Sequence, residues 1–129
     1  MLEIGLGCDM KYGPGASVKL WKQILKISDE IWEAEVDKDC AEKFKKTLED
    51  VKIVSGDQAD EATLRRWVVE TNANNEGFDV IIDDGGHENH QIYASFNVLF
   101  HEALAPGGLY FIEDLHVNRL VAWKDATGF

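Results

Sequence analysis

The sequence predicts a single α/β domain, residues 1–129, built on an open and mostly parallel β-sheet with helices on both faces. Two observations favour this fold class. Short apolar runs alternate with amphipathic stretches along the chain, an order typical of right-handed βαβ crossovers. Several of these runs are apolar on successive residues, as in strands that are buried on both faces of a sheet. The length of 129 residues is that of one domain.

Five short apolar runs are the expected strands. Open parallel sheets bind ligands at the carboxyl ends of their strands, near the point where the strand order reverses. The residues that directly follow each run therefore carry most of the information about function. The expected strands are Leu2–Gly5, Glu30–Val36, Val51–Gly56, Phe78–Asp83 and Gly108–Asp114.

Between the strands, apolar residues recur at helical spacing and predict four helices that pack against the sheet. Ser17 is the expected N-cap of the first helix and Asp60 that of the third. The segment Ala105–Gly108 is expected to end the fourth. The apolar faces comprise Val18, Trp21, Ile24 and Leu25; Ala41, Phe44 and Leu48; Leu64, Trp67, Val68 and Thr71; and Ile92, Phe96, Leu99, Phe100, Ala103 and Leu104.

The charge and the composition exclude several classes of partner. The formal net charge is -11, which repels a phosphate backbone, so we expect no nucleic-acid partner. No apolar run approaches the roughly 18 residues of a membrane span, and the N-terminus lacks the plan of a signal peptide. We expect a cytoplasmic protein in which Cys8 and Cys40 are reduced thiols, because their spacing matches no disulfide scaffold.

Glycines follow the first expected strand at Gly5, Gly7, Gly13 and Gly15. Without a side chain, the backbone there can turn sharply and approach a ligand closely. Met10 stands where the dinucleotide-binding fingerprint has its third glycine, which disfavours a nicotinamide or flavin cofactor.

Polar residues follow the second and third strands. Glu35, or secondarily Asp37, could accept hydrogen bonds from the hydroxyls of a ribose, which nucleoside cofactors often require at this position. Asp57 or Gln58 could contact the edge of an adenine. The alternative for any one of these acids is a solvated side chain at a strand end.

Two pairs of carboxylates, Asp83 with Asp84 and Glu113 with Asp114, end the fourth and fifth strands. If these strands are neighbours, their ends lie about 5 Å apart, and the carboxylates repel one another unless protons or a cation intervene. Such oxygen-rich clusters suit Mg²⁺. The chemistry alone does not choose between Asp83 and Asp84 as a ligand. Helix capping or solvation is the alternative role of these acids.

His87 follows Asp84 by three residues, at the expected start of the fourth helix. A neutral imidazole at this place could take the proton from a substrate hydroxyl while a metal ion lowers the pKa of that hydroxyl. Capping of the helix is the alternative.

The motifs LEIGLG, EAEVD, GDQ, FDVIIDDGGH and LAPGGLYFIEDL together resemble those of class I S-adenosylmethionine-dependent methyltransferases. The Glu-x-Gly-x-Gly pattern of Glu3, Gly5 and Gly7 is similar to that family's first motif. More narrowly, YGPGASVKLW, IIDDGGH and GGLYFIEDL resemble the metal-dependent sugar O-methyltransferases of macrolide biosynthesis, of the mycinamicin and macrocin type. The resemblance implies a Rossmann-like methyltransferase fold that lacks its last strands and an upstream segment.

The resemblance also implies roles for individual residues. Those implied to contact S-adenosylmethionine are Glu3, Gly5 and Gly7 at the methionine end, Glu35 at the ribose, Asp57 and Gln58 at the adenine, and Asp83 nearby. Those implied to bind Mg²⁺ are Asp84, Glu113 and Asp114. His87 is implied to be the catalytic base.

The expected function is therefore methyl transfer from S-adenosylmethionine, with the help of Mg²⁺, to a hydroxyl of a small molecule such as a sugar or a natural product. One alternative is a truncated or degenerate domain that binds the cofactor without catalysis. A weaker alternative is an NAD-dependent oxidoreductase. Missing strands would leave a sheet edge that a second copy of the chain could cover, which favours a homo-oligomer.

Overall fold

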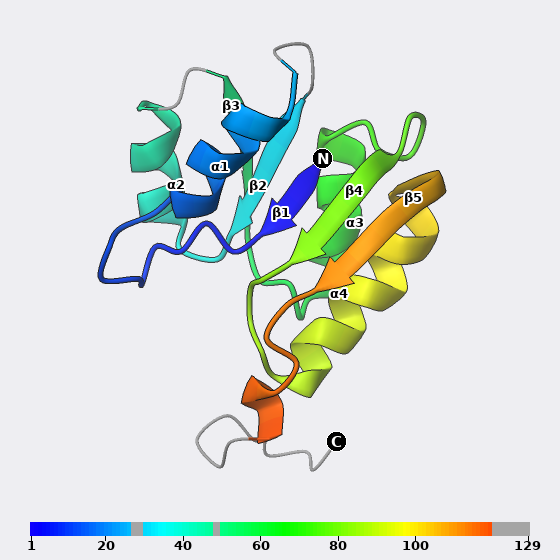
Figure 1. Cartoon of the computed structure of the whole chain (residues 1–129). Helices are drawn as coiled ribbons and strands as arrows, with labels where there is room; N and C mark the ends of the chain where they lie inside the picture. The colour runs from blue at the N-terminus through cyan, green and yellow to red at the C-terminus, as the bar shows by residue number, and fades with distance from the viewer. Residues whose placement is uncertain (27–29, 48–49, 120–129) are drawn as a thin grey trace.

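The computed structural model describes residues 1–26, 30–47 and 50–119. Its five strands form one parallel sheet in the order β3-β2-β1-β4-β5 (Figure 1). The predicted fold class is confirmed, and each expected strand is present. The order reverses between β1 and β4, which places a ligand site at the carboxyl ends of these two strands. The strands are β1 (Leu2–Ile4), β2 (Ile31–Glu35), β3 (Val51–Ser55), β4 (Phe78–Asp83) and β5 (Leu104–Ile112).

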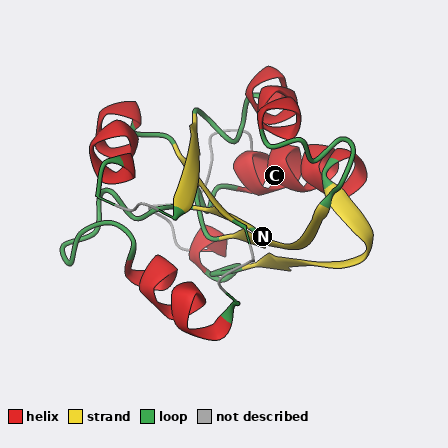
Figure 2. Ribbon diagram, turned by 90° about the horizontal axis from the view of Figure 1, so that it is seen from above, coloured by secondary structure: helices red, strands yellow, loops and turns green. Residues whose placement is uncertain are grey.

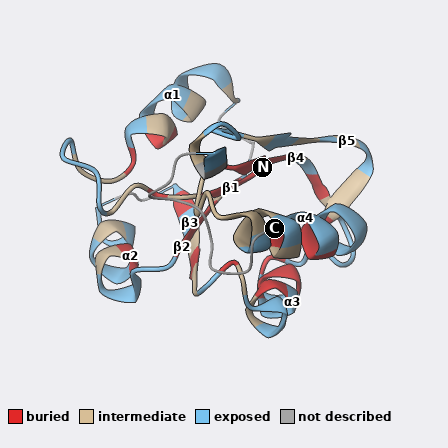
Figure 3. Cartoon of the chain, turned by 90° about the horizontal axis from the view of Figure 1, so that it is seen from below, coloured by how far each residue is buried: buried red, intermediate tan, exposed pale blue. Residues whose placement is uncertain are grey.

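Helices lie on both sides of this sheet, which forms the middle layer of the domain (Figure 2). Helix α1 lies on one face, whereas α3 and α4 lie on the other (Figure 3). The described helices are α1 (Ala16–Ile24), α2 (Lys38–Lys45), α3 (Glu61–Glu70), α4 (Asn89–Glu102) and a 3₁₀ turn, η1 (Val117–Arg119). No helix in the described ranges is long and apolar enough to cross a membrane.

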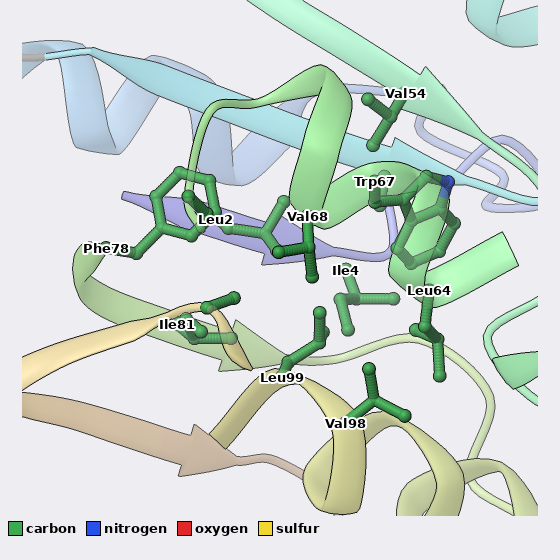
Figure 4. Packing of buried hydrophobic residues seen from close by; sticks show 13 residues of the cluster. Leu2, Ile4, Val54, Leu64, Trp67, Val68, Phe78, Ile81, Val98 and Leu99 are labelled. Carbon is green, nitrogen blue, oxygen red and sulfur yellow. The ribbon is translucent and has the colours of Figure 1, made fainter. Parts of the chain in front are cut away.

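The larger core cluster fills the space between the sheet and helices α3 and α4 (Figure 4). It contains Ile4 from β1, Ile81 from β4, Trp67 from α3 and Leu99 from α4, all at most 3% exposed. The predicted apolar face of α3 is confirmed, since Leu64, Trp67, Val68 and Thr71 are buried. Burial of these side chains stabilises the carboxyl ends of β1 and β4, on which the site is built.

A smaller cluster packs α1 and α2 against the other face and includes Val18, Trp21 and Phe44. Beside it, Cys8 and Cys40 form a disulfide. The expectation of two reduced thiols was therefore wrong, because the fold brings the loop after β1 against the first turn of α2. A sequence separation of 32 residues gives no sign of that approach.

The helix caps agree with the prediction in part. Asp60 caps α3 as expected, and its carboxylate accepts hydrogen bonds from the Ala62 and Thr63 amides. Gly15, in the left-handed conformation, is the N-cap of α1. Ser17, the predicted cap, instead lies in the first turn and donates to the Glu3 carboxylate at 2.8 Å. Leu48, predicted for the face of the second helix, lies outside the described residues.

The boundary between α4 and β5 differs from the prediction. Helix α4 ends at Glu102, and β5 already begins at Leu104. The segment Ala105–Gly108, expected to stop the helix, is an irregular part of β5: Phe78 pairs with Leu104, but Val80 pairs with Leu109. Four residues of β5, 105–108, thus stand opposite the single residue Asp79 of β4, and a glycine-rich segment accommodates this bulge.

The buried face of α4 also differs from the predicted apolar stripe. Ser95 and Val98 are buried with Leu99, whereas Phe96 and Phe100 are 38% and 43% exposed. The two phenylalanine rings stack on each other, and Phe96 meets Tyr110 edge to face. A serine faces the core here because its hydroxyl has an acceptor there, the Asp83 carboxylate.

Two glutamates lie under α1 in register on neighbouring strands. Glu3 on β1 pairs with Glu33 on β2, and they are 2% and 0% exposed. Trp21 Nε1 donates to the Glu3 carboxylate at 2.9 Å, whereas neither Glu33 oxygen has a hydrogen-bond partner among the described residues. Burial and the neighbouring Glu3 carboxylate raise the pKa of Glu33 well above its ordinary value.

Candidate active site

A cleft of about 770 Å³ runs along the carboxyl ends of the strands. This volume is within the range of small-molecule sites. The residues that line it come from the loop after β1, the ends of β2 and β3, and the segments after β4 and β5. The predicted site residues among them are Gly5, Gly7, Glu35, Asp57, Gln58, Asp84, His87, Glu113 and Asp114.

The loop after β1 brings its backbone directly against the start of the β4 loop. Gly5 has a φ of 107°, and a Cβ atom on it would lie 2.2 Å from the Asp84 carbonyl oxygen. Only glycine fits this conformation and this approach together. Glu3 is implied to line the methionine end of the cofactor. It lies on β1, two residues before Gly5, where it is buried and does not line the cleft.

Glu35 ends β2 at the mouth of the cleft, with its carboxylate held by main-chain amides. The Asp37 amide donates to one oxygen at 2.9 Å, and the Cys8 amide donates to the other at 3.4 Å. The second candidate, Asp37, is the N-cap of α2, because its side chain accepts from the Cys40 amide. The local structure thus favours Glu35 as the acceptor for a ribose.

Asp57 and Gln58 follow β3, but their side chains differ in environment. Asp57 is exposed, and its carboxylate accepts from the Ala59 amide at 2.8 Å. Gln58 is 6% exposed, and its amide donates to the buried Asp83 carboxylate at 3.0 Å. Of this pair, Asp57 has the side chain that is free to meet a ligand in the cleft.

Asp83 and Asp84 point to different environments, as successive residues of a strand do. Asp83 is 2% exposed and is absent from the cleft lining. Its carboxylate accepts hydrogen bonds from Gln58 and Ser95. Burial raises the pKa of Asp83, and these hydrogen bonds oppose that shift. Asp84 lies in the cleft, so the geometry separates two acids that the sequence left equivalent.

Asp84, His87 and Asp114 form a compact group of potential metal ligands. One ligand atom from each lies within 4.8 Å of the others. Asp114 has a positive φ of 51°, a conformation that aspartate adopts more readily than most residues. The Glu113 amide donates to the Asp83 carbonyl at 2.9 Å, which extends the contact between the two strand ends. Glu113 lines the cleft but is not one of the compact three.

The charges around Asp84 are those of a cation site. Burial, and then the Glu113 carboxylate, raise the pKa of Asp84 to about 6. His87 opposes this shift, and Asp114 adds to it. A bound cation would relieve the repulsion among these acids, and carboxylate oxygens are preferred ligands of Mg²⁺. The donor set therefore fits a magnesium ion.

Two residues that support the site, Ser95 and Tyr110, were not predicted from the sequence. Ser95 and Tyr110 both donate to Asp83 Oδ2, Tyr110 at 3.4 Å. Each lies in a stretch of apolar character, where the pattern indicates packing alone. Only Ser95 could have been found from the sequence, because it lies at helical spacing from the buried residues Val98 and Leu99 of α4.

The strand order, the glycine loop and the acids after β4 and β5 together define a class I S-adenosylmethionine-dependent methyltransferase fold. Within this class the chain is similar to the sugar O-methyltransferases of macrolide biosynthesis, as its motifs implied. It is 38% identical over 118 residues to demethylmacrocin O-methyltransferase of Streptomyces fradiae, covering 89% of this chain and 27% of that one. No known family profile matches the chain.

Two further relatives are also O-methyltransferases. The 8-demethyl-8-alpha-L-rhamnosyl tetracenomycin-C 2'-O-methyltransferase of Streptomyces olivaceus is 32% identical, over 98% of this chain and 31% of its own length. Mycinamicin VI 2''-O-methyltransferase of Micromonospora griseorubida is 34% identical, over 89% and 27%. The chain thus spans about a third or less of the relatives that it matches.

A solved structure agrees with this assignment. The MycE methyltransferase of the mycinamycin biosynthetic pathway, in complex with Mg and SAH, superimposes with a TM-score of 0.76 at 30% identity. The match covers 98% of this chain and 32% of that one. The Rossmann-like methyltransferase fold is confirmed by this likeness.

Proposed function

We propose that the chain carries the cofactor and metal sites of an S-adenosylmethionine-dependent, Mg²⁺-dependent O-methyltransferase that acts on a hydroxyl of a small molecule, a sugar or a natural product. The observation that carries this proposal is the convergence of Asp84, His87 and Asp114 at a cleft that also contains the glycine loop. The activities of the relatives and the Mg and SAH in the MycE structure support it.

S-Adenosylmethionine would lie along the ends of β1, β2 and β3. Gly5 and Gly7 let the backbone approach the methionine end, Glu35 accepts from the ribose, and Asp57 borders the adenine. Gln58 lines the cleft, but its side-chain amide is engaged with Asp83. Glu3 and Asp83, both buried behind the cleft, would act on the cofactor only through the residues they support.

Mg²⁺ would be held by Asp84 and Asp114, with Glu113 as the third carboxylate, and would lower the pKa of the bound hydroxyl. His87 is near enough to these carboxylates to take the proton from that hydroxyl. The hydroxyl oxygen would then attack the methyl group as the bond from sulfur to that carbon breaks. Since this is a direct displacement, the protein mainly supplies orientation and removal of the proton.

Methyl transfer to simple glycosides, measured with and without Mg²⁺, tests this function. His87→Asn should lower turnover by about 10²–10⁴-fold, the usual contribution of a general base, and should leave binding of S-adenosylhomocysteine intact. Asp84→Asn should weaken metal binding as well. Full turnover in both variants would refute the mechanism.

A domain that binds the cofactor without catalysis is the second candidate. Calorimetric binding of S-adenosylmethionine with no methyl transfer to any acceptor would establish this function. Tight binding of NAD instead would indicate an oxidoreductase.

A cytoplasmic location and a homo-oligomer also remain predictions. Leu109 and Phe111, on the last strand of the described sheet, are 57% and 49% exposed, which favours a partner surface there. Sedimentation velocity tests self-association. Cell fractionation combined with trapping of thiols tests the compartment, because the cytosol keeps most cysteines reduced.

A further inference from the structure

A buried hydrogen-bonded group lies directly beneath the turn that carries Asp84 and His87. Its members are Gln58, Asp83 and Ser95, which are 6%, 2% and 0% exposed. Gln58 Nε2 donates to Asp83 Oδ1 at 3.0 Å, and Ser95 Oγ donates to Asp83 Oδ2. Three polar side chains, from the loop after β3, from β4 and from α4, thus meet in an otherwise apolar region, where each missing hydrogen bond would carry a large penalty.

The turn between Asp84 and His87 packs against the side-chain amide of Gln58 and is hydrogen-bonded to it. The Gly86 amide donates to Gln58 Oε1 at 2.6 Å. A Cβ atom on Gly85 would lie 2.1 Å from the same oxygen. Gln58 therefore contacts both residues between Asp84 and His87, and a shift of its amide would move the main chain that carries them.

Asp83 fixes which way this amide faces. Asp83 Oδ1 accepts from the NH₂ group of Gln58, so the side-chain oxygen of Gln58 faces the turn, where it accepts from the Gly86 amide. Ser95 and Tyr110 hold the other oxygen of Asp83. The orientation of the turn is consequently set in the core, two hydrogen bonds away from the cleft.

We propose that Gln58 and Ser95 are positioning residues: through Asp83 and the Gly85–Gly86 main chain they hold Asp84 in the geometry that binds the metal ion, and His87 beside it. This inference rests on the proposed function. It assigns a role to a buried glutamine whose side-chain amide is bonded to Asp83 and to the Gly86 main chain. Hydrogen bonds behind metal ligands typically change metal affinity by about 10–100-fold.

Two substitutions test the proposal with Mn²⁺ as the probe, by electron paramagnetic resonance of the free ion. Gln58→Met keeps the size of the side chain and removes both hydrogen bonds, and Ser95→Ala removes only the hydroxyl. Both should raise the dissociation constant of Mn²⁺ by about 10–100-fold. Ser95 does not line the cleft, so Ser95→Ala should bind S-adenosylhomocysteine as the unmodified chain does.

Thr71→Val is the matched control, because Thr71 is also a buried hydroxyl, bonded to the Trp67 carbonyl at 2.8 Å on α3. It should change Mn²⁺ affinity less than twofold. Unchanged Mn²⁺ affinity in Ser95→Ala overturns the proposal, and this variant decides the matter if Gln58→Met does not fold. If the unmodified chain binds no Mn²⁺, the metal site itself is refuted, and the positioning role with it.

Discussion

Gly5 and Asp84 are in direct main-chain contact across the reversal of strand order. A Cβ atom on Gly5 would lie 2.2 Å from the Asp84 carbonyl oxygen, and the Asp84 amide donates to the neighbouring Ile4 carbonyl at 3.0 Å. The glycine loop after β1 and the proposed metal ligand Asp84 are therefore in direct main-chain contact. We therefore expect a displacement of the loop after β1 to move Asp84 as well.

Gly5→Ala should consequently damage both sites. The left-handed backbone disfavours alanine by about 1–2 kcal/mol, and the clash with Asp84 adds about 1–3 kcal/mol. Gly13→Ala is the control, since Gly13 also has a positive φ but a Cβ there meets nothing within 4 Å. Urea unfolding and Mn²⁺ titration should show a larger loss for Gly5→Ala. Equal losses in the two variants would contradict the contact.

Metal affinity should depend on pH through Asp84, whose pKa lies at about 6 without a metal ion. Protons and the cation compete for this carboxylate, so affinity should be constant well above pH 6. It should fall by up to about tenfold for each pH unit below that value. Mn²⁺ titrations between pH 5 and 8 measure this dependence.

Glu113→Gln provides the control for the cause of that shift. The Glu113 carboxylate raises the pKa of Asp84, so the amide should move the midpoint of the pH dependence downward. A midpoint that stays in place would show that Glu113 does not raise the pKa of Asp84. Affinity that is flat from pH 5 to 7 in the unmodified chain would show that Asp84 does not compete for the ion.

Glu33→Gln should stabilise the chain at neutral and higher pH. Because the pKa of Glu33 is raised in the folded state, folding retains a proton there, and the free energy of unfolding falls as pH rises above the ordinary value of 4.5. The slope is about 1.4 kcal/mol per pH unit within that window. The amide removes the titration and can donate to Glu3.

Urea unfolding of Glu33→Gln at several pH values measures this effect, with Glu42→Gln, an exposed glutamate on α2, as the control. Glu33→Gln should flatten the fall in stability above pH 4.5, and Glu42→Gln should leave it in place. A Glu33→Gln variant that is less stable than the unmodified chain at pH 8 would refute the interpretation.

Reduction of the Cys8–Cys40 disulfide should destabilise the chain by about 3–4 kcal/mol, from the loop-closure entropy of a 32-residue separation. The reduced loop would also lose its anchor beside Glu35, so S-adenosylhomocysteine should bind more weakly. Urea unfolding and calorimetry with and without dithiothreitol measure the two effects. The Cys8→Ser/Cys40→Ser variant should be unaffected by the reductant.

The fold was predictable because its elements are local. Each strand and each helix has its own apolar pattern, and Asp60 caps α3 by contacts within three residues. The errors arise where distant segments decide the outcome. Ser17 bonds Glu3 across 14 residues instead of capping α1, and Cys8 meets Cys40 only once β1 and α2 are placed.

The candidate site was predictable to the level of strand ends and no further. Neighbouring parallel strands bring Asp84 near Asp114 by topology alone, and the resemblance supplied the roles. Asp83 is held in the core by a hydrogen bond from Ser95, whereas Asp84 lines the cleft. Ser95 is polar and is not part of the apolar pattern from which α4 was predicted. The orientation of the Gln58 side chain likewise depends on its hydrogen bond to the buried Asp83 carboxylate.

The reversal of strand order also divides the domain for protein engineering. The residues proposed to contact the cofactor belong to the β1–β3 half, and the proposed metal ligands and base belong to the segment from Phe78 onward. A chimaera that exchanges this segment with a relative would replace the proposed metal ligands and the proposed base together. Gln58, however, lies on the other half, so a functional recombination boundary has to keep Gln58 and Asp83 from the same parent.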